Sequence, residues 1–425
     1  MKVLIVGSGG REHAIALAVS RSPRVDKIYC APGNAGIESL AECVPINAMD
    51  FDGLLDFAKK ESIDFAIIGM DDPLVGGIVD RFEEAGIRTF GPRQNAAILE
   101  GSKAFSKELM KKYGIPTAAY ETFDDADAAA EYLKKESRYP VVLKADGLAL
   151  GKGVLICQNE QEALAGVREI MQDKKFGSAG DRMVIEEYMT GREVSVLSFC
   201  DGKTIRIMSS AQDHKRAGDG DTGLNTGGMG TFSPSPFYTA EVDEFCKKHI
   251  YQATVDAMAA EGREFKGVIF FGLMLTDEGP KVLEYNCRFG DPEAQVVLPR
   301  LQGDIIEIME ACVDGRLSEV DVDFEDNAAV CVVLASDGYP VKYEKGFPIE
   351  GLDRFDEKEY FCFHAGTARS ESGQIVTNGG RVLGVTALGE DLATARKKAY
   401  EATKWVSFDN KYMRSDIGKA IEEVE

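Results

Sequence analysis

The chain has 425 residues, of which 44% are hydrophobic, and a formal net charge of −22 from 49 basic and 71 acidic side chains. This length exceeds what one hydrophobic core usually serves and predicts about three folding units. The acidic balance argues against a general surface for nucleic acid or anionic membranes. An anionic substrate would therefore have to be held by local basic groups and backbone amides.

Cysteine usage and the first residues indicate the compartment. Nine cysteines occur singly, with no C-x-x-C pair, and the opening MKVLIVGSGG resembles a strand entering a glycine turn more than a signal peptide. No apolar run approaches the length of a membrane span. We therefore expect a cytoplasmic protein with reduced thiols and no zinc or disulfide framework.

The first hundred residues alternate strand-like and helix-like segments. Residues 2–7, KVLIVG, predict a buried strand that enters a glycine turn and a helix, and similar units follow before residue 92. Such alternation predicts a doubly wound parallel sheet with helices on both faces. Ligands of these sheets bind beyond the carboxyl ends of the strands, where the loops 7–11, 32–36 and 69–73 would lie.

A nicotinamide dinucleotide site is a minor alternative for the first loop, because Gly7 and Gly9 match the beginning of G-x-G-x-x-G. The third glycine position holds Glu12, and the second strand ends in Cys30-Ala31-Pro32, where a ribose-binding acid would be expected. A loop of small residues that opens a helix still presents backbone N–H groups suited to a single phosphate.

Two lysine-bearing segments follow. A helix is predicted over residues 95–113, and it contains Lys103, which taken alone would be a surface lysine. The segment 139–158, YPVVLKADGLALGKGVLICQ, is more specific, because two strand-like runs flank a glycine loop that has a lysine on each side. Such a loop can close over phosphates, although it is not a Walker A motif. The residues concerned are Lys144, Gly147, Gly151, Lys152 and Gly153.

The next two segments are candidate linker and substrate loops. A strand-like segment contains Glu186, Glu187, Tyr188 and Met189, then Glu193, and we expect it to link two lobes with its backbone facing a purine. Residues 209–236 form the longest loop-like segment, a length that is usually functional or disordered. The charged run 213–216 and the glycine run 227–230 favour function, with a solvated loop position as the alternative for His214.

The segment 283–293, LEYNCRFGDPE, follows a tight turn at 277–280 and is predicted to form the second strand of a hairpin. Because side chains alternate along a strand, Glu284, Asn286 and Arg288 share one face. Carboxylate and amide oxygens suit Mg²⁺, and a guanidinium can hold a carboxylate or phosphate by two hydrogen bonds. A solvated strand face is the alternative, but the upstream lysines and glycine loop favour the metal.

A change in composition near residue 321 precedes a last unit of mostly strand character, closed by a helix over 392–406. This pattern predicts a mixed α+β unit. A structural role is favoured for its His364 over a ligand role, whereas Arg381, which follows two glycines, could meet a phosphate.

Together these motifs resemble the glycinamide ribonucleotide synthetase (phosphoribosylamine–glycine ligase) family of the ATP-grasp superfamily over essentially the whole chain. The similarity is carried by VGSGGREHA, APGNAG, FGP, EGSKAF, KADGLALGKGV, QDHKR, NTGGMG, EYNCRFGDPE, HAGT, NGGRVLGVTALG and RSDIG. It implies an α/β and α+β multidomain protein. The implied parts are an amino-terminal α/β domain (1–102), a linking helix (103–118), an ATP-grasp lid (119–188), a central catalytic domain (189–325) and a carboxyl-terminal domain (326–425).

The resemblance also implies ATP-driven joining of glycine to 5-phosphoribosylamine through glycyl phosphate, in purine biosynthesis and with Mg²⁺ or Mn²⁺. It places Lys103, Lys144 and the loop 147–153 at the ATP phosphates, residues 186–189 at adenine, Glu193 at the ribose, and Glu284 with Asn286 at the metal. It assigns Arg288, Lys215, Asp213 and Asp291 to catalysis and to binding glycine and the amine. It assigns Gly9, Gly10 and Asn34 to the sugar phosphate, Asp71 to its ribose, and Arg381 to a phosphate.

Two segments depart from the family pattern. Asp71 stands where a glutamate is usual, which shortens the implied ribose contact, and Val341 stands where a turn glycine is usual. The alternatives are an ATP-grasp carboxylase acting on a purine intermediate and, least favoured, a non-enzymatic nucleotide sensor. No nucleic-acid or membrane partner is expected. The sequence leaves the oligomeric state open, with a monomer as the working expectation.

Overall fold

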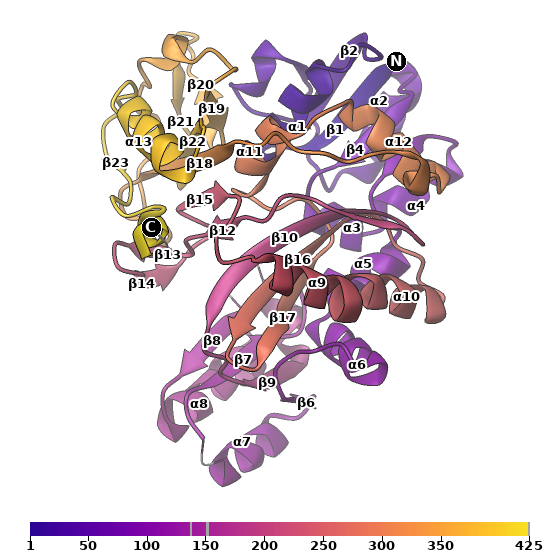
Figure 1. Cartoon of the computed structure of the whole chain (residues 1–425), viewed down its shortest axis with the longest axis vertical. Helices are drawn as coiled ribbons and strands as arrows, with labels where there is room; N and C mark the ends of the chain where they lie inside the picture. The colour runs from indigo at the N-terminus through magenta and orange to yellow at the C-terminus, as the bar shows by residue number, and fades with distance from the viewer. Residues whose placement is uncertain (137, 150–152, 424–425) are drawn as a thin grey trace.

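The computed structural model describes residues 1–136, 138–149 and 153–423. Gly151 and Lys152, which were expected in the phosphate-binding loop, lie outside the described residues. The larger sheets occupy different parts of the molecule, with the amino-terminal and carboxyl-terminal units side by side above a central sheet and a separate lobe below it (Figure 1).

The amino-terminal unit is built on a five-stranded parallel sheet. Its order is β3 (Glu42–Cys43), β2 (Lys27–Pro32), β1 (Lys2–Gly7), β4 (Phe65–Ile68) and β5 (Arg88–Phe90). Alternate residues of β1 enter different cores: Val3 and Ile5 pack with α1 (Gly10–Ser20), while Leu4 and Val6 pack with α2 (Phe51–Glu61) and α4 (Ile78–Glu84). Because both faces are covered, the strand is apolar throughout, and the predicted doubly wound sheet is confirmed.

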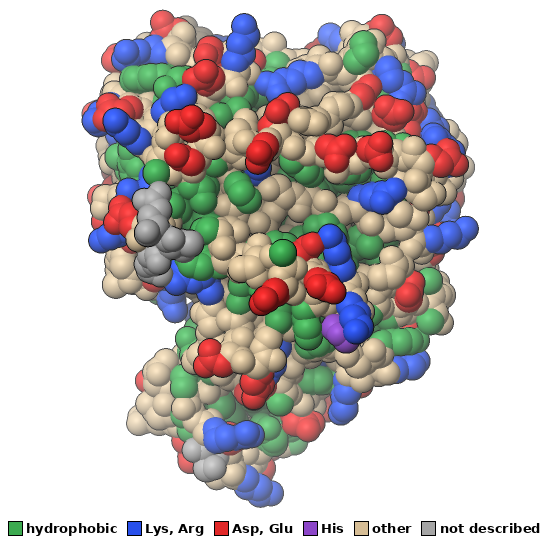
Figure 2. Space-filling view, viewed as in Figure 1, with side chains coloured by type: hydrophobic (Ala, Val, Ile, Leu, Met, Phe, Trp, Pro, Cys, Tyr) green, Lys and Arg blue, Asp and Glu red, His purple; other side chains and the backbone are tan. Residues whose placement is uncertain are grey.

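The lower lobe is a four-stranded antiparallel sheet covered by helices. Its order is β6 (Tyr120–Phe123), β9 (Met183–Glu187), β7 (Val141–Ala145) and β8 (Val154–Cys157). The helices α7 (Ala126–Lys135) and α8 (Glu160–Val167), the latter extended by the π-helical η2 (Arg168–Gln172), pack against it. Figure 2 shows that a notch sets this lobe off from the body.

The central sheet holds the predicted hairpin. Its order is β11 (Ile205–Ile207), β10 (Arg192–Asp201), β16 (Lys266–Thr276) and β17 (Gly279–Asn286). One face packs with α6 (Lys103–Tyr113) and with the helical run α9 (Ala240–Cys246), η4 (Lys247–Tyr251) and α10 (Gln252–Ala260). The other face packs with α12 (Ile305–Asp314) and the amino-terminal unit.

The carboxyl-terminal sheet draws on two distant parts of the chain. Its order is β12 (Gln212–Asp213), β15 (Gly230–Ser233), β18 (Ala328–Ser336), β22 (Arg381–Gly389) and β19 (Tyr360–His364), with β23 (Lys411–Tyr412) also paired to β18. The helix α13 (Leu392–Thr403) packs on β18 and β22. Two of these strands therefore precede the expected domain boundary at residue 326.

Two predictions of local structure are wrong. Residues 209–236 are not an irregular loop, because they carry β12, the hairpin of β13 (Arg216–Gly218) and β14 (Thr222–Asn225), and β15. The helix predicted over 95–113 is two helices, α5 (Gln94–Gly101) and α6, separated at Ser102. Ser102 is extended (φ −141°, ψ 112°), and its hydroxyl accepts a hydrogen bond from Phe105 N at 3.1 Å, which caps the second helix.

Two buried histidines join the amino-terminal and carboxyl-terminal units. His364 N donates to His13 Nδ1 at 2.8 Å, and His364 Nδ1 lies 2.9 Å from Thr367 Oγ1. Burial and the neighbouring His364 lower the pKa of His13 to about 3, and burial and Arg369 lower the pKa of His364 to about 4. The structural role expected for His364 is thereby supported. None of the described helices combines the length and apolar composition needed to cross a membrane.

We expect the free energy of unfolding to fall as the pH drops below the ordinary histidine pKa of 6.5. The folded state keeps His13 and His364 neutral while the unfolded chain binds protons, so stability present above pH 6.5 is lost at about 1.4 kcal/mol per histidine per pH unit. Urea unfolding of His13→Gln between about pH 5 and about pH 7 should show a shallower slope than the unsubstituted chain. His249→Gln, at an exposed position of η4, is the control, and equal slopes in all three proteins would contradict this account.

Candidate active site

Glu284 on β17 is surrounded by lysines from three segments. Lys215 Nζ, two residues beyond β12, lies 3.2 Å from Glu284 Oε1 and 3.1 Å from Glu193 Oε2. Lys215, acting against burial and with help from Lys144 and Lys103, lowers the pKa of Glu284 to about 2. Glu284 is therefore ionised at neutral pH, and it offers a carboxylate inside a ring of positive charge.

The two lysines predicted at the phosphates are held from different lobes. Lys144 on β7 places Nζ 3.0 Å from Glu186 Oε2 and donates to Leu283 O at 3.2 Å. Lys103, the first residue of α6, donates from Nζ to Gly147 O at 3.0 Å. Lys107 shares Glu186 at 3.2 Å, so the Glu186 carboxylate holds two lysines. Glu186 Oε1 is buried and has no hydrogen-bond partner among the described residues, so this oxygen is left for the adenine contact expected of Glu186.

A small apolar cluster lies beside these lysines, between the lower lobe and the central sheet. Ala118, Met189 and Met274 are buried there, with Leu283 packed against them. Met189 was expected near the purine from the sequence, whereas Ala118, Met274 and Leu283 were not assigned to it. Apolar side chains of this kind line sites for flat aromatic ligands. The cluster is a candidate surface for a purine.

The connection beside this cluster is held by Glu187. Its backbone N donates to Ala119 O at 3.0 Å, and its carboxylate accepts from Ala119 N at 2.9 Å. Tyr188, the next residue, is exposed. The predicted linker between the two lobes therefore consists of two segments, around residues 119 and 187, that are hydrogen-bonded to each other.

Arg288, just beyond the end of β17, is organised by a residue that the sequence did not single out. Glu100 is buried, accepts hydrogen bonds from Asn286 Nδ2 (2.8 Å) and Cys287 N (2.7 Å), and forms an ion pair with Arg288 Nη2 (3.2 Å). Asp71 Oδ2 lies 4.0 Å from the same guanidinium. Arg288 Nε is buried and, among the described residues, has no hydrogen-bond partner. An unfilled donor on an oriented guanidinium fits an anionic ligand.

Glu100 could have been suspected from its position alone. It lies in the last turn of α5, where the helix dipole disfavours a negative side chain. Burial raises its pKa, while Arg288 opposes that shift. A buried acid at an unfavourable helix end indicates a partner elsewhere, but the sequence gives no indication of which segment supplies it.

Asp213 and Glu293 form an acidic pair behind Arg288. Burial and the charge of Glu293 raise the pKa of Asp213 well above its ordinary range. Glu293 accepts from Ser195 Oγ at 3.0 Å, and burial raises its pKa. Asp213 Oδ1 is buried with no hydrogen-bond partner among the described residues. Such an acceptor fits an amino group of a ligand, as expected for Asp213.

The glycine loop that opens α1 is filled by acidic side chains. Gly9 N donates to Glu12 Oε2 at 2.7 Å, and Arg11 N lies 3.4 Å from Asp291 Oδ2. A Cβ on Gly10 would come within 2.5 Å of Gln295 Nε2, so a larger residue there would require the Gln295 side chain to shift. These carboxylates lie at the backbone N–H groups of the helix start, where a phosphate was expected. The Glu12 side chain also occupies the space in the loop that a dinucleotide would need.

Two further predicted contacts hold segments together. Asn34 Nδ2 donates to Ser8 O (2.8 Å) and His364 O (2.7 Å), while Asn34 Oδ1 accepts from two backbone N–H groups, those of residues 36 and 37. Arg381 Nη1 donates to Gly227 O (2.7 Å) and Asp291 O (2.8 Å). Both side chains thus bridge loops of the amino-terminal, central and carboxyl-terminal units.

Glu284 and Asn286 are the candidate metal ligands. No group of three or more His, Cys, Asp or Glu side chains able to hold a metal occurs in the part of the chain that the structure describes. One ionised carboxylate and one amide oxygen, with the Asn286 amide nitrogen engaged by Glu100, fit Mg²⁺ bound largely through phosphates and water. This donor set is consistent with a metal that arrives with a nucleotide.

An antiparallel lid and a central antiparallel sheet, with Lys103, Lys144 and Lys215 near Glu284, are typical of an ATP-grasp ligase. Three family models match successive parts of the chain: the N domain of phosphoribosylglycinamide synthetase at residues 1–100, its ATP-grasp (A) domain at 101–294 and its C domain at 329–420. The chain belongs to the phosphoribosylglycinamide synthetase family. The predicted family, fold class and ATP-dependent ligase class are thereby confirmed.

Similar proteins extend over the full chain. A phosphoribosylamine–glycine ligase of Caldanaerobacter subterraneus subsp. tengcongensis is 49% identical over 417 residues, covering 98% of this chain and 99% of its own. One of Halalkalibacterium halodurans is 47% identical over 424 residues, covering 100% and 98%. The crystal structure of the Thermotoga maritima phosphoribosylamine–glycine ligase has a TM-score of 0.86 at 35% identity, covering 98% of this chain and 100% of that one.

More distant structures share the fold. The biotin carboxylase domain of Hydrogenobacter thermophilus 2-oxoglutarate carboxylase, a complex with MgADP and bicarbonate, has a TM-score of 0.73 at 18% identity, covering 97% of this chain and 91% of that one. At this identity the likeness shows the architecture alone. The carboxylase alternative is therefore addressed by the chemistry of the site.

We expect Asn34→Ala to destabilise the fold by about 2–4 kcal/mol, because it leaves several buried backbone groups without partners. Thermal and urea unfolding measure this effect. Asn47→Ala, at an exposed position where the side chain caps a local turn, is the matched control and should change stability little. If Asn34→Ala left unfolding unchanged but lowered kcat/KM for the phosphorylated substrate, a direct phosphate contact would be supported instead.

Proposed function

We propose that the chain joins glycine to 5-phosphoribosylamine, using ATP and giving glycinamide ribonucleotide, ADP and phosphate in purine biosynthesis. The relatives' names suggest these substrates. The observation that carries the proposal is the ring of Lys103, Lys144 and Lys215 around the ionised Glu284, with the unfilled donor of Arg288 beside it. This arrangement suits the transfer of the terminal phosphoryl group of ATP to the carboxylate of glycine.

The nucleotide occupies the cleft between the lid and the central sheet. Its purine packs on the cluster of Ala118, Met189, Met274 and Leu283, with the segment 186–189 at its edge. Glu193 binds the ribose hydroxyls. The phosphates extend toward Lys103 and Lys144 beneath the loop that includes Gly147 and Gly153. Positive charge there offsets the repulsion between ATP and an acidic protein.

Glu284 and Asn286 would hold Mg²⁺ or Mn²⁺. The ion would neutralise phosphate charge and orient the terminal phosphoryl group. Lys215 already provides a cation at this carboxylate, 3.2 Å away, so the position is built for positive charge.

The reaction proceeds in two steps. The glycine carboxylate attacks the terminal phosphoryl group of ATP, giving glycyl phosphate and ADP. The amine of phosphoribosylamine then attacks the glycyl carbonyl carbon, and phosphate leaves as the amide forms. Arg288 steadies the carboxylate and the moving phosphoryl group, so its effect is mainly positioning and charge neutralisation.

The acids behind Arg288 bind the amino groups. Asp213, with its unfilled buried Oδ1, binds the ammonium group of glycine, and Lys215 neutralises Asp213 and the reacting centre. Asp291 and Asp71 face the phosphoribosylamine side of the cleft, where Arg288 and Arg11 keep the pKa of Asp71 low against the effect of burial. Arg381 and the backbone of Gly9, Gly10 and Asn34 line the same side.

We also propose a cytoplasmic monomer. All nine cysteines are free thiols, which supports a reducing compartment. The site is assembled within one chain, so a monomer is sufficient for the reaction.

Glu284→Gln and Arg288→Ala should each lower the rate of glycine-dependent ADP release by about 100-fold or more in a chain that still folds. The first removes the anionic ligand and the second removes the oriented guanidinium. Glu278→Gln, at the exposed hairpin turn of the same two strands, is the matched control. Near-normal turnover in either site variant would refute the assignment.

Metal binding gives a readout independent of turnover. Mn²⁺ added with ADP should bind the unsubstituted chain, and Glu284→Gln should weaken that binding about tenfold or more in electron paramagnetic resonance titrations. Glu278→Gln should bind as the unsubstituted chain does. Equal Mn²⁺ affinity in Glu284→Gln would place the metal elsewhere.

Substrate addition distinguishes the ligase from its alternatives. ADP release should require glycine, and stoichiometric release should require phosphoribosylamine as well. Bicarbonate in place of glycine should support no release, because the acidic Asp213 and Glu293 suit an ammonium group that bicarbonate lacks. Release with bicarbonate would favour the carboxylase, and ATP binding without substrate-stimulated hydrolysis would favour a nucleotide sensor.

A further inference from the structure

Asp146, directly after β7, makes an unusually complete junction with the start of α6. Its carboxylate accepts hydrogen bonds from Ala104 N at 2.7 Å and Ser102 Oγ at 2.9 Å. Its backbone carbonyl accepts from Lys103 N at 3.0 Å. A carboxylate at a helix amino terminus is favoured by the helix dipole and by the unpaired N–H groups of the first turn.

The same residue is anchored in the lid from its other side. Asp146 N lies 2.9 Å from Ala179 O and 3.0 Å from Arg182 O, so it donates to the segment before β9. Asp146 therefore forms hydrogen bonds to both the lid and the start of α6. It lies two residues after Lys144 and immediately before Gly147.

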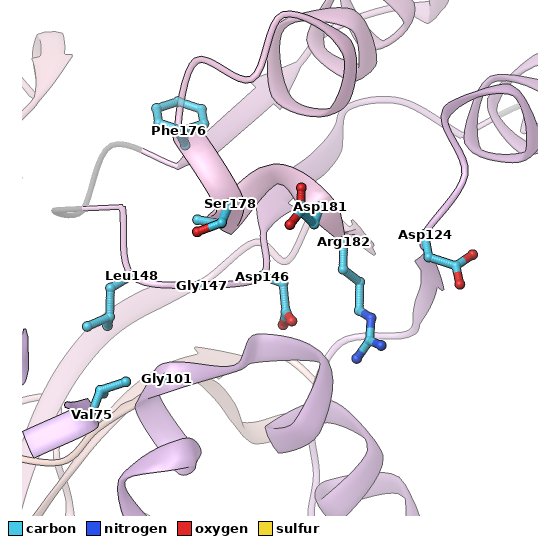
Figure 3. A pocket seen from close by; sticks show the side chains of 11 residues that line it. Val75, Gly101, Asp124, Asp146, Gly147, Leu148, Phe176, Ser178, Asp181 and Arg182 are labelled. Carbon is cyan, nitrogen blue, oxygen red and sulfur yellow. The ribbon is translucent and has the colours of Figure 1, made fainter. Parts of the chain in front are cut away.

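A cavity of about 570 Å³ surrounds this junction and separates lid from body. Its lid wall includes Phe176 and Asp181, and its body wall includes Gly101 of α5 and Val75 of α3 (Asp71–Val75). In Figure 3 the Asp146 side chain points across toward the helical segment that carries Gly101, whereas the Asp124 side chain points away. The contacts of Lys107 with Glu186 and of Lys144 with Leu283 O also join the lid to the body, but the Asp146 carboxylate contacts the first turn of α6.

We propose that Asp146 is the positioning residue that latches the lid to α6 and so sets the two phosphate lysines in register. Lys103 is fixed through its own backbone N–H, which donates to Asp146, and through its Nζ, which donates to Gly147 O at 3.0 Å. Lys144 is fixed on the adjoining strand. Asp146 itself touches no substrate, and it acts through Lys103, Lys144 and Gly147.

The latch predicts an effect confined to the nucleotide. The lysines of the lid and of the body must lie on opposite sides of the same phosphates. Loosening the junction between lid and body therefore weakens the binding of ATP and ADP more than the binding of glycine. Arg288 and Asp213 lie on the central and carboxyl-terminal sheets, and they keep their contacts without Asp146. The proposal rests on the proposed function for the identity of the ligand at Lys103 and Lys144.

The test compares Asp146→Ala and Asp146→Asn with Asp124→Ala, an exposed acid on the lid wall of the same cavity. We expect Asp146→Ala to raise the Kd for MgADP, measured by calorimetry, and the KM for ATP by about tenfold, with the KM for glycine within about twofold. Asp146→Asn, which keeps the shape but loses the charge, should lie between Asp146→Ala and the unsubstituted chain. Asp124→Ala should match the unsubstituted chain.

The latch is overturned if MgADP binds Asp146→Ala within about twofold of the unsubstituted chain, or if the KM values for ATP and glycine rise together with a lower Tm. Should Asp146→Ala not fold, Asp146→Asn decides by the same criteria. Failure of the proposed function is distinguishable: the unsubstituted chain would then bind MgADP yet form no glycinamide ribonucleotide, and the calorimetric comparison would still test the latch.

Discussion

The structure depends on gathering lysine side chains around Glu284 inside a protein whose net charge is −22. The lysines at Glu284 come from the lid, from α6 and from the segment after β12, so no single element holds the charge. Three separate units must dock correctly before Glu284 meets its lysines. Charge repulsion among the lysines of the site and their neighbours is offset by acids placed between them, such as Glu186 between Lys107 and Lys144. The fold and the site are thus coupled through electrostatics.

Buried acidic side chains orient the cationic and amide groups of the site, because each one contacts groups from more than one unit. Glu100 accepts two hydrogen bonds, from Asn286 and Cys287, and pairs with Arg288, which orients the Arg288 guanidinium. Asp291 does the same at another boundary, facing Arg11 N on α1 and Arg381 on β22. In each case an ionised group from one unit orients a cationic or amide group from another. Removing either partner would leave a buried charge unpaired, which costs more than the pair contributes.

The sequence predicted what depends on local periodicity and missed what depends on distant pairing. The shared face of Glu284 and Asn286 follows from the two-residue repeat of a strand, and the parallel sheet follows from alternating strands and helices. Glu100 and Glu293 lie within recognised motifs, yet their roles arise from contacts to residues 98 to 187 positions away. The break at Ser102 was missed because a serine within an apolar repeat resembles a helical residue until its capping bond is seen. Strand β15 was missed because its partner β18 lies in the last hundred residues, and β12 was missed with it because β12 pairs with β15.

The charged side chains of the site are already paired with one another before substrates bind, and this pairing determines which ligands can bind there. Lys215 already pairs with Glu193 and Glu284, Glu12 and Asp291 already satisfy the start of α1, and Glu186 already pairs with Lys144. Binding of anionic phosphates and a cation therefore exchanges partners and does not expose bare charges, which reduces the desolvation penalty that a charged site would otherwise carry. The same exchange gives selectivity, because a ligand that supplies only one of the two charges leaves a lysine or a carboxylate unpaired. Under the proposed reaction, an acyl phosphate would form where a nucleotide, a cation and a carboxylate together restore that balance.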